Sequence, residues 1–133
     1  MFAGKHLKIM NEKSETGTLG EDAAIRYLED KNFSIIRRNI RDKWGEIDIL
    51  CLDSSKTLVF VEVKTIRQNN PAIAGLTPED NLTAAKLKKM KRTAQMFAGK
   101  HPELINDKSG WRIDLIAITM FAGKHSISHY ENL

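Results

Sequence analysis

The sequence predicts a single α/β domain in which helices flank a mixed β-sheet. The hydrophobic periodicity changes along the chain in the order helix, three strands, helix, two strands. The connection from Val63 to Ile113 contains a helix, so we expect a right-handed crossover and a fourth strand parallel to the third. A chain of 133 residues, 41% of them apolar, has the usual size for one domain with a hydrophobic core. We therefore expect one domain over residues 14–133, after a flexible polar leader over residues 1–13.

The first half of the chain carries one predicted helix and three predicted strands. Apolar residues at helical spacing follow threonine cap candidates and predict a helix over residues 16–32, which Asn32 can end in a left-handed conformation. Three β-rich segments follow at residues 33–41, 44–53 and 57–66. The turn residues DSSK between the last two segments predict a hairpin.

The second half begins with a loop rich in turn residues and continues with a basic helix. Thr77 is a candidate cap and Pro78 suits the first helical position, which predicts a helix over residues 77–101. Strands are expected at residues 111–119 and 126–131, the last one added to the core at its C-terminus. The expected buried stripe of the basic helix consists of Leu87, Met90, Ala94 and Phe97.

One hexamer, MFAGKH, occurs three times without change, at Met1–His6, Met96–His101 and Met120–His125. The copies have unequal spacing and unrelated flanks, which excludes a solenoid or propeller built from whole repeated units. The second copy can continue a helix, and the third places Gly123 and Lys124 where a hairpin turn is expected. Because the copies contain three of the four histidines, we assign no metal site to histidine.

The composition limits the class of protein and its partners. A formal charge of +4 and a pI near 9.2 are mildly basic and permit an anionic partner. Cys51 is the single cysteine, which excludes an intramolecular disulfide and a zinc site of clustered cysteines, and fits a reducing compartment. The chain has no apolar run long enough to span a bilayer and no signal-peptide core. We expect a cytoplasmic protein without membrane contact. A homodimer is compatible with this composition.

Charged residues interrupt two predicted strands that are otherwise apolar. Side chains alternate along a strand, so Glu62 and Lys64 share one face. If residues 54–56 form the hairpin loop, Asp48 pairs with Glu62. In the same register Glu46 faces Lys64. Opposed side chains have Cβ atoms about 4.5–5.5 Å apart, and like charges in that position repel each other. Two carboxylates so placed favour a cation between them.

Two interpretations of this charged cluster remain open at this point. In the structural one, Lys64 and Arg112 neutralise the three carboxylates at a solvated end of the sheet. In the functional one, Asp48 and Glu62 hold a hard divalent cation, Mg²⁺ or Mn²⁺. Lys64 could then orient or deprotonate a water, or neutralise charge on a phosphorane-like transition state. Glu21 is either a fourth acidic group or a glutamate that favours a helix start.

The basic run KLKKMKR lies within the second predicted helix. A charge run on a helix is often a solvated face, but beside a metal site it can hold backbone phosphates without reading bases. The candidate nucleic-acid-binding residues are Lys86, Lys88, Lys89, Lys91 and Arg92.

The order of these motifs resembles the YraN-like (UPF0102) family of predicted endonucleases. LGEDAA, RRNIRDKWGEIDIL, LVFVEVKT, a basic helix and WRIDLIAI carry the resemblance, from about Gly17 to Ile118. That family is similar to archaeal Holliday-junction resolvases within the PD-(D/E)xK nuclease superfamily. The resemblance implies a restriction-endonuclease-like αβββαβ core.

The same resemblance implies roles for individual residues. It makes Asp48 and Glu62 metal ligands, Lys64 the catalytic lysine and Glu21 an accessory acid at the metal. It also favours Lys86 as the residue of the basic helix nearest the site. Cys51 and Trp111 are interpreted as core residues.

We therefore expect a nuclease, a hydrolase that cleaves DNA phosphodiester bonds with Mg²⁺ or Mn²⁺, at branched or damaged structures. DNA is the expected partner rather than RNA. One alternative is a non-catalytic nucleic-acid-binding module on the same fold. Another is a protein-interaction domain in which the charged cluster is structural.

Overall fold

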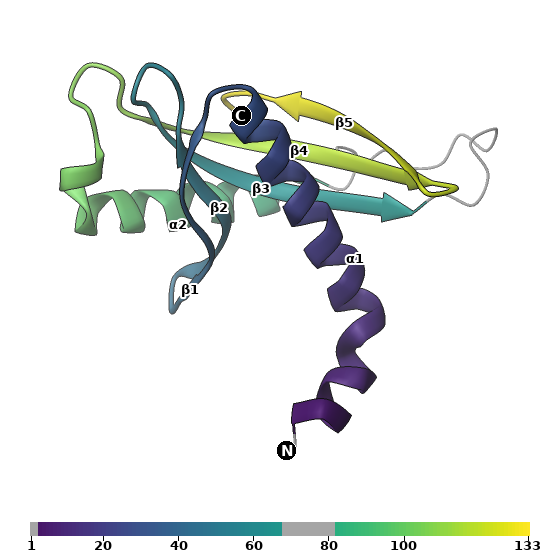
Figure 1. Cartoon of the computed structure of the whole chain (residues 1–133). Coiled ribbons are helices and arrows are strands. Elements are labelled where there is room, and N and C mark those ends of the chain that lie inside the picture. Colours follow the sequence, from purple (N-terminus) through teal and green to yellow (C-terminus); the bar gives the residue numbers. More distant parts are fainter. Residues whose placement is uncertain (1–2, 68–81) are drawn as a thin grey trace.

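The computed structural model describes residues 3–67 and 82–133 and has the expected α/β architecture. A mixed sheet of five strands in the order β1-β2-β3-β4-β5 lies between two α-helices (Figure 1). This arrangement is consistent with a restriction-endonuclease-like core with an added C-terminal strand. The elements are α1 (Ala3–Asp30), β1 (Ser34–Asp42), β2 (Gly45–Leu52), β3 (Leu58–Arg67), α2 (Ala84–Lys100), the 3₁₀ helix η2 (Pro102–Leu104), β4 (Trp111–Phe121) and β5 (Lys124–Tyr130).

The sheet has one parallel pair among antiparallel ones. β3 pairs with β4 in parallel, as the crossover predicted, and the other neighbours are antiparallel. The β2–β3 register agrees with the expected one, with Leu50 opposite Phe60. The Asp53 amide donates to the Thr57 carbonyl over 3.1 Å, which closes a three-residue loop, and Lys56 has a φ of 67° at its last position.

The two helices cover opposite faces of the sheet (Figure 1), and each buries its own apolar cluster. Gly20 allows α1 to pack closely on β3, because a Cβ atom there would lie 2.1 Å from Thr65 Oγ1. The cluster under α1 includes Ala23, Ala24, Leu28, Cys51, Val59 and Val61. The cluster under α2 includes Leu50, Phe60, Ala94, Phe97, Ala98 and the half-buried Trp111.

Both helices begin at positions that differ from the predicted ones. α1 begins at Ala3, so the leader is helical from Ala3 onward, whereas the sequence predicted a start near residue 16. α2 begins at Ala84, where Thr83 Oγ1 accepts a hydrogen bond from the Lys86 amide over 3.1 Å. The cap predicted at Thr77 and Pro78 lies outside the described residues. The division into a flexible leader and a domain stays a prediction.

The repeated hexamer adopts different structures in its different contexts. Its second copy continues α2 as expected, while its third copy ends β4, turns and begins β5. Ala122 and Gly123 form that two-residue turn, with φ values of 49° and 77°, whereas Lys124, expected in the turn, is the first residue of β5. The described helices include none that is both long and apolar enough to cross a membrane.

The β4–β5 turn offers a stability test. An alanine at positive φ is strained, so Ala122→Gly should raise the free energy of unfolding by about 0.5–1 kcal/mol, measured by urea denaturation. Gly123→Ala is the matched control, because its added Cβ meets no atom within 4 Å and only the φ of 77° opposes it. The control should be destabilised. Equal stability of all three proteins would contradict this account of the turn.

Candidate metal and nucleic-acid site

The site begins where the β2–β3 ladder ends. The last ladder pair is Ile49 with Val61. One residue further, the Asp48 carboxylate accepts a hydrogen bond from the Val63 amide, with Oδ2 and N 2.8 Å apart. A side chain thus replaces the next backbone partner and holds the Asp48 carboxyl between the two strands. The continuous ladder pairing expected between Asp48 and Glu62 is therefore replaced by contact between their side chains.

Asp48 and Glu62 form a pair of half-buried carboxyl groups that contact each other. Burial and the neighbouring Asp48 raise the pKa of Glu62 to about 7, although Lys64 opposes this shift. Burial is also the main cause that raises the pKa of Asp48, while its hydrogen bond from Val63 and the charge of Lys64 act in the other direction. The two carboxyl groups lie within hydrogen-bonding reach of each other. Ionising both of them without a cation is therefore unfavourable.

Lys64 lies on the same face as this pair, as predicted from the strand alternation. Its Nζ is 3.5 Å from Glu62 Oε1, and the side chains of Lys64 and Glu62 are 33% and 21% exposed. One ammonium group beside two carboxyl groups does not compensate both charges. A further positive charge beside Asp48 and Glu62 would therefore be electrostatically favourable.

Glu21 reaches the same region from α1. The close packing of Gly20 on Thr65 brings this turn of α1 against β3. Burial is the largest cause that raises the pKa of Glu21, and the charge of Asp48 is the second. When the Asn39 amide nitrogen faces Glu21, it donates to Oε1 over 2.8 Å. Glu21 thus contributes negative charge to the site without contacting Glu62 directly.

Glu46 departs from the expected position opposite Lys64. Its ladder partner is Arg41 of β1, and Arg41 Nε lies 3.6 Å from Glu46 Oε1. Both side chains are exposed, so this ion pair contributes little to stability. Glu46 still lines the cleft beside Asp48 and Glu62.

The acidic pair and Lys64 open into a cleft of about 440 Å³ between the sheet and α2. Lys86 and Lys89 extend from α2 into its wall. Both lysines are exposed, and they lie three residues apart on one face of the helix. The cleft therefore combines carboxylates on its floor with ammonium groups on its wall. The other described residues that line it include Asp42, Lys43, Trp44, Gly45, Met90 and Thr93.

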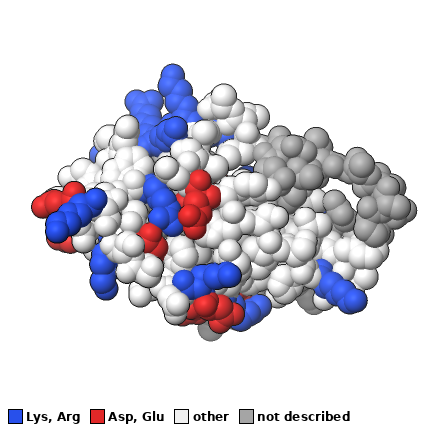
Figure 2. Space-filling model, turned by 90° about the horizontal axis from the view of Figure 1, so that it is seen from above, with Lys and Arg blue, Asp and Glu red and all other residues white. Residues whose placement is uncertain are grey.

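The structure separates the basic run of α2 into two sets. Lys88 and Lys91 are exposed and fall on the opposite face of the helix from the cleft, while Arg92 is exposed on the flank of the helix and does not line the cleft. On the face seen in Figure 2, basic and acidic side chains alternate in small groups, so that face has no continuous basic patch. Of the basic run, only Lys86 and Lys89 therefore line the cleft, together with Lys43 and Lys64 from the sheet side.

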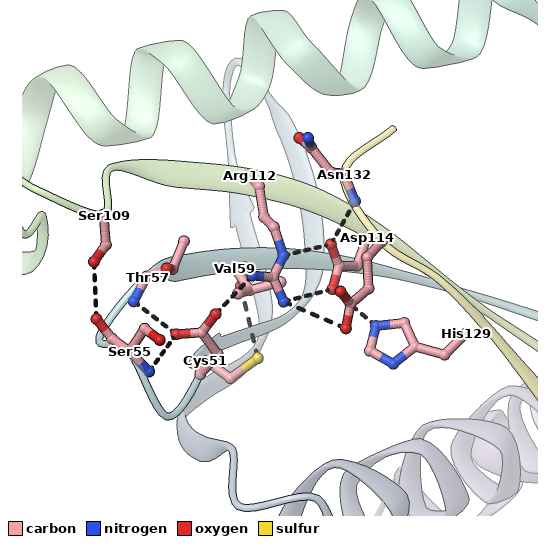
Figure 3. Close-up of polar contacts among 11 residues, drawn as sticks. Cys51, Ser55, Thr57, Val59, Ser109, Arg112, Asp114, His129 and Asn132 are labelled. Carbon is pink, nitrogen blue, oxygen red and sulfur yellow. Dashed lines mark hydrogen bonds and ion pairs between the residues drawn. The ribbon is translucent and has the colours of Figure 1, made fainter.

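Arg112 belongs to a second polar network away from the cleft (Figure 3), so its expected role beside Asp48 and Glu62 is wrong. Arg112 Nη1 donates to Asp53 over 2.6 Å and Nε donates to Asp114 over 2.9 Å. Asp114 is fully buried, and hydrogen bonds from its partners hold its pKa below the ordinary value despite the burial.

Sequence reasoning missed Asp114 and its partner His129. The signal was available, because an aspartate within the apolar run WRIDLIAI interrupts a strand in the same way as Glu62 interrupts LVFVEVKT. Asp114, His129 and Glu131 each place one ligand atom within 4.8 Å of the others, so this group could hold a metal ion. A cation there would have to displace Arg112 from Asp114.

The fold and the cleft define the class of protein as an α/β protein with a restriction-endonuclease-like arrangement and a carboxylate-lined cleft. The chain belongs to the uncharacterised protein family UPF0102, whose model matches residues 20–118. The matched range contains Glu21, Asp48, Glu62, Lys64 and the basic run of α2.

Relatives in several bacteria match most of the chain. A UPF0102 protein of Syntrophomonas wolfei is 32% identical over 118 residues, which cover 89% of this chain and 96% of that protein. A UPF0102 protein of Lawsonia intracellularis is 37% identical over 123 residues, covering 90% and 84% of the two chains. One of Alkaliphilus oremlandii is 33% identical over 123 residues, covering 92% and 98%.

The raised pKa of Glu62 predicts a pH-dependent stability. In the folded protein the pKa is about 7, against an ordinary value of 4.5, so the folded state holds a proton that the unfolded state has lost between these values. Stability is therefore lost as the pH rises through this range. In EDTA, Glu62→Gln should leave the free energy of unfolding unchanged at pH 4. At pH 8 the same substitution should raise the free energy of unfolding by about 1–3 kcal/mol.

Urea denaturation at the two pH values measures this difference. Glu29→Gln is the control, because Glu29 is exposed on α1 and should change little at either pH. The same change for Glu62→Gln at pH 4 and pH 8 would contradict the raised pKa.

Proposed function

We propose that this chain is a metal-dependent endonuclease that hydrolyses DNA phosphodiester bonds with Mg²⁺ or Mn²⁺. The observation that carries the proposal is the pair of Asp48 and Glu62, with Lys64 Nζ 3.5 Å from Glu62, in a cleft lined by Lys86 and Lys89. Acidic groups that bind a cation and basic groups that bind phosphates are the two parts that such a reaction needs.

The donor set fits a hard divalent cation. Asp48 and Glu62 offer carboxylate oxygens, the ligand type that Mg²⁺ and Mn²⁺ prefer. Burial raises the pKa of both groups, and the charge of Asp48 adds to the shift of Glu62, so a divalent charge between them would relieve a cost present in the metal-free protein. Glu21 adds a further carboxyl group from α1, whose pKa is also raised by burial and by Asp48.

The roles of the residues follow from their positions. Asp48 and Glu62 would hold the cation, with Glu21 as an accessory acid. When bound, the cation supplies polarisation of a phosphoryl oxygen and a lower pKa for a bound water. Lys64 orients the attacking water or neutralises the charge that builds on the phosphate. In the reaction, a water oxygen bonds to phosphorus, one ester P–O bond breaks, and a proton reaches the leaving oxygen.

The likeness to archaeal Holliday-junction resolvases supports a branched or damaged DNA as the substrate. Only two lysines of α2 line the cleft, and phosphate contacts of this kind carry no base sequence. We therefore propose selection by DNA structure rather than by sequence. DNA is the proposed substrate, and RNA is a comparison in the assay.

The test separates chemistry from phosphate binding. Lys64→Ala should lower the cleavage rate by about 10²–10⁴-fold while DNA affinity stays within about threefold. Reversing the charge at Lys86 and Lys89 should lower the slope of log affinity against log salt by about 1.8, or 0.9 for each lost phosphate contact on duplex DNA. Cleavage is measured on single-stranded, duplex and four-way DNA and on RNA, with Mg²⁺ or Mn²⁺.

The matched control reverses Lys88 and Lys91, which carry the same charge on the opposite face of the same helix. It should keep the parental salt slope. If the salt slope fell equally in both charge-reversed proteins, the effect would come from net charge rather than from contacts in the cleft. DNA binding without cleavage under any metal would favour the non-catalytic nucleic-acid-binding module.

A further inference from the structure

Trp44 stands at the tip of the β1–β2 hairpin, on the rim of the cleft. Asp42 pairs with Gly45 across the hairpin, which leaves Lys43 and Trp44 as its two turn residues. Both line the same cleft as Asp48 and Glu62. An aromatic residue and a cationic residue thus lie next to each other in its lining.

The position of Trp44 is fixed from the side of α2. Thr93 Oγ1 donates to the Trp44 carbonyl over 2.9 Å. Gly45 has a φ of 142°, and a Cβ atom there would lie 2.6 Å from Thr93 Oγ1, so only glycine permits this approach. Lys100 Nζ lies 4.5 Å from the centre of the indole ring. Lys100 is not among the described residues that line the cleft, so it contacts the ring from outside the cleft.

The core does not account for this ring. Trp111, the other tryptophan, packs against the apolar cluster under α2 and forms an edge-on contact with Phe60, with ring centres 5.5 Å apart. Among the described residues, Trp44 belongs to neither buried cluster. Thr93 holds the backbone of Trp44, and Lys100 contacts its half-buried ring, so these contacts restrict the residue before a ligand binds. Stacking on it then costs little conformational entropy.

We propose that Trp44 stacks on an unpaired base of the nucleic-acid strand whose phosphate lies between Lys64 and the α2 lysines. The inference rests on the proposed function, because it takes the cleft as a phosphodiester site. Bases within a duplex have both faces covered by their neighbours, so an aromatic ring stacks on a base that is unpaired or extruded. Trp44 therefore selects single-stranded or locally unpaired DNA at the cleavage site.

Binding without cleavage tests this role. The assay uses EDTA, so that binding is measured without cleavage. The probes are an oligothymidylate of twelve nucleotides, the same strand with abasic sites, and a duplex of equal length. The Trp111→Phe protein leaves Trp44 as the single tryptophan, because the chain has two. Its fluorescence should be quenched by the oligothymidylate and much less by the other two probes.

The variants Trp44→Phe and Trp44→Leu separate stacking from packing. Trp44→Phe keeps an aromatic face and should bind the oligothymidylate within about threefold of the parent. Trp44→Leu should bind it about 5–100-fold more weakly, yet bind the abasic strand as well as the parent does. Both expected results support the proposal.

Two results would overturn the proposal. Equal quenching by the oligothymidylate and the abasic strand would show that the ring does not contact bases. If Trp44→Leu weakened the binding of the oligothymidylate and of the abasic strand equally, Trp44 would be a packing residue. These readouts need no cleavage, so they are independent of the Lys64→Ala test. Base stacking without cleavage would contradict the proposed enzyme alone, and cleavage without quenching would contradict the stacking role alone.

Discussion

The hydrogen bond from the Val63 amide to the Asp48 carboxylate is the constraint on which the site depends. It ends the β2–β3 ladder after Ile49 and Val61 and supplies the half-buried Val63 amide with an acceptor. Because this bond fixes the Asp48 carboxyl beside Glu62, two acidic groups occupy a half-buried position that neither would favour alone. The close approaches of Gly20 to Thr65 and of Gly45 to Thr93 then bring α1 and α2 against this point.

Two acidic clusters of this chain differ in how their charges are matched. Asp114 is fully buried, but Arg112, His129 and the Asn132 amide surround it, and its pKa is lowered. Asp48 and Glu62 are less buried, yet burial raises their pKa values, and the charge of Lys64 only partly opposes these shifts. The first arrangement is typical of a structural ion network. The second is typical of a site that awaits a cation, since functional sites concentrate such perturbed groups.

Local sequence patterns predicted the strands and the face of the sheet that carries Asp48, Glu62 and Lys64, because side-chain alternation has a fixed period of two. The predicted three-residue loop between β2 and β3 also gave the correct register of these two strands. Alternation puts Arg112 and Asp114 on one face of β4, but patterns could not predict their partners, because Asp53 and His129 come from segments that only the fold brings to β4. Patterns also could not separate Lys86 and Lys89 from the rest of the basic run. That separation depends on how α2 is rotated against the sheet.

The most direct test is calorimetric titration with Mn²⁺ at pH 6.5 in two buffers of different ionisation enthalpy. If Asp48 and Glu62 share a cation, binding must displace the proton that the raised pKa of Glu62 retains, so about one proton should be released. The variant with Asp48→Ala and Glu62→Ala should lose both the binding heat and the proton release. Unchanged Mn²⁺ binding in that variant would place the ion elsewhere, for example at Asp114, His129 and Glu131, and would contradict the account.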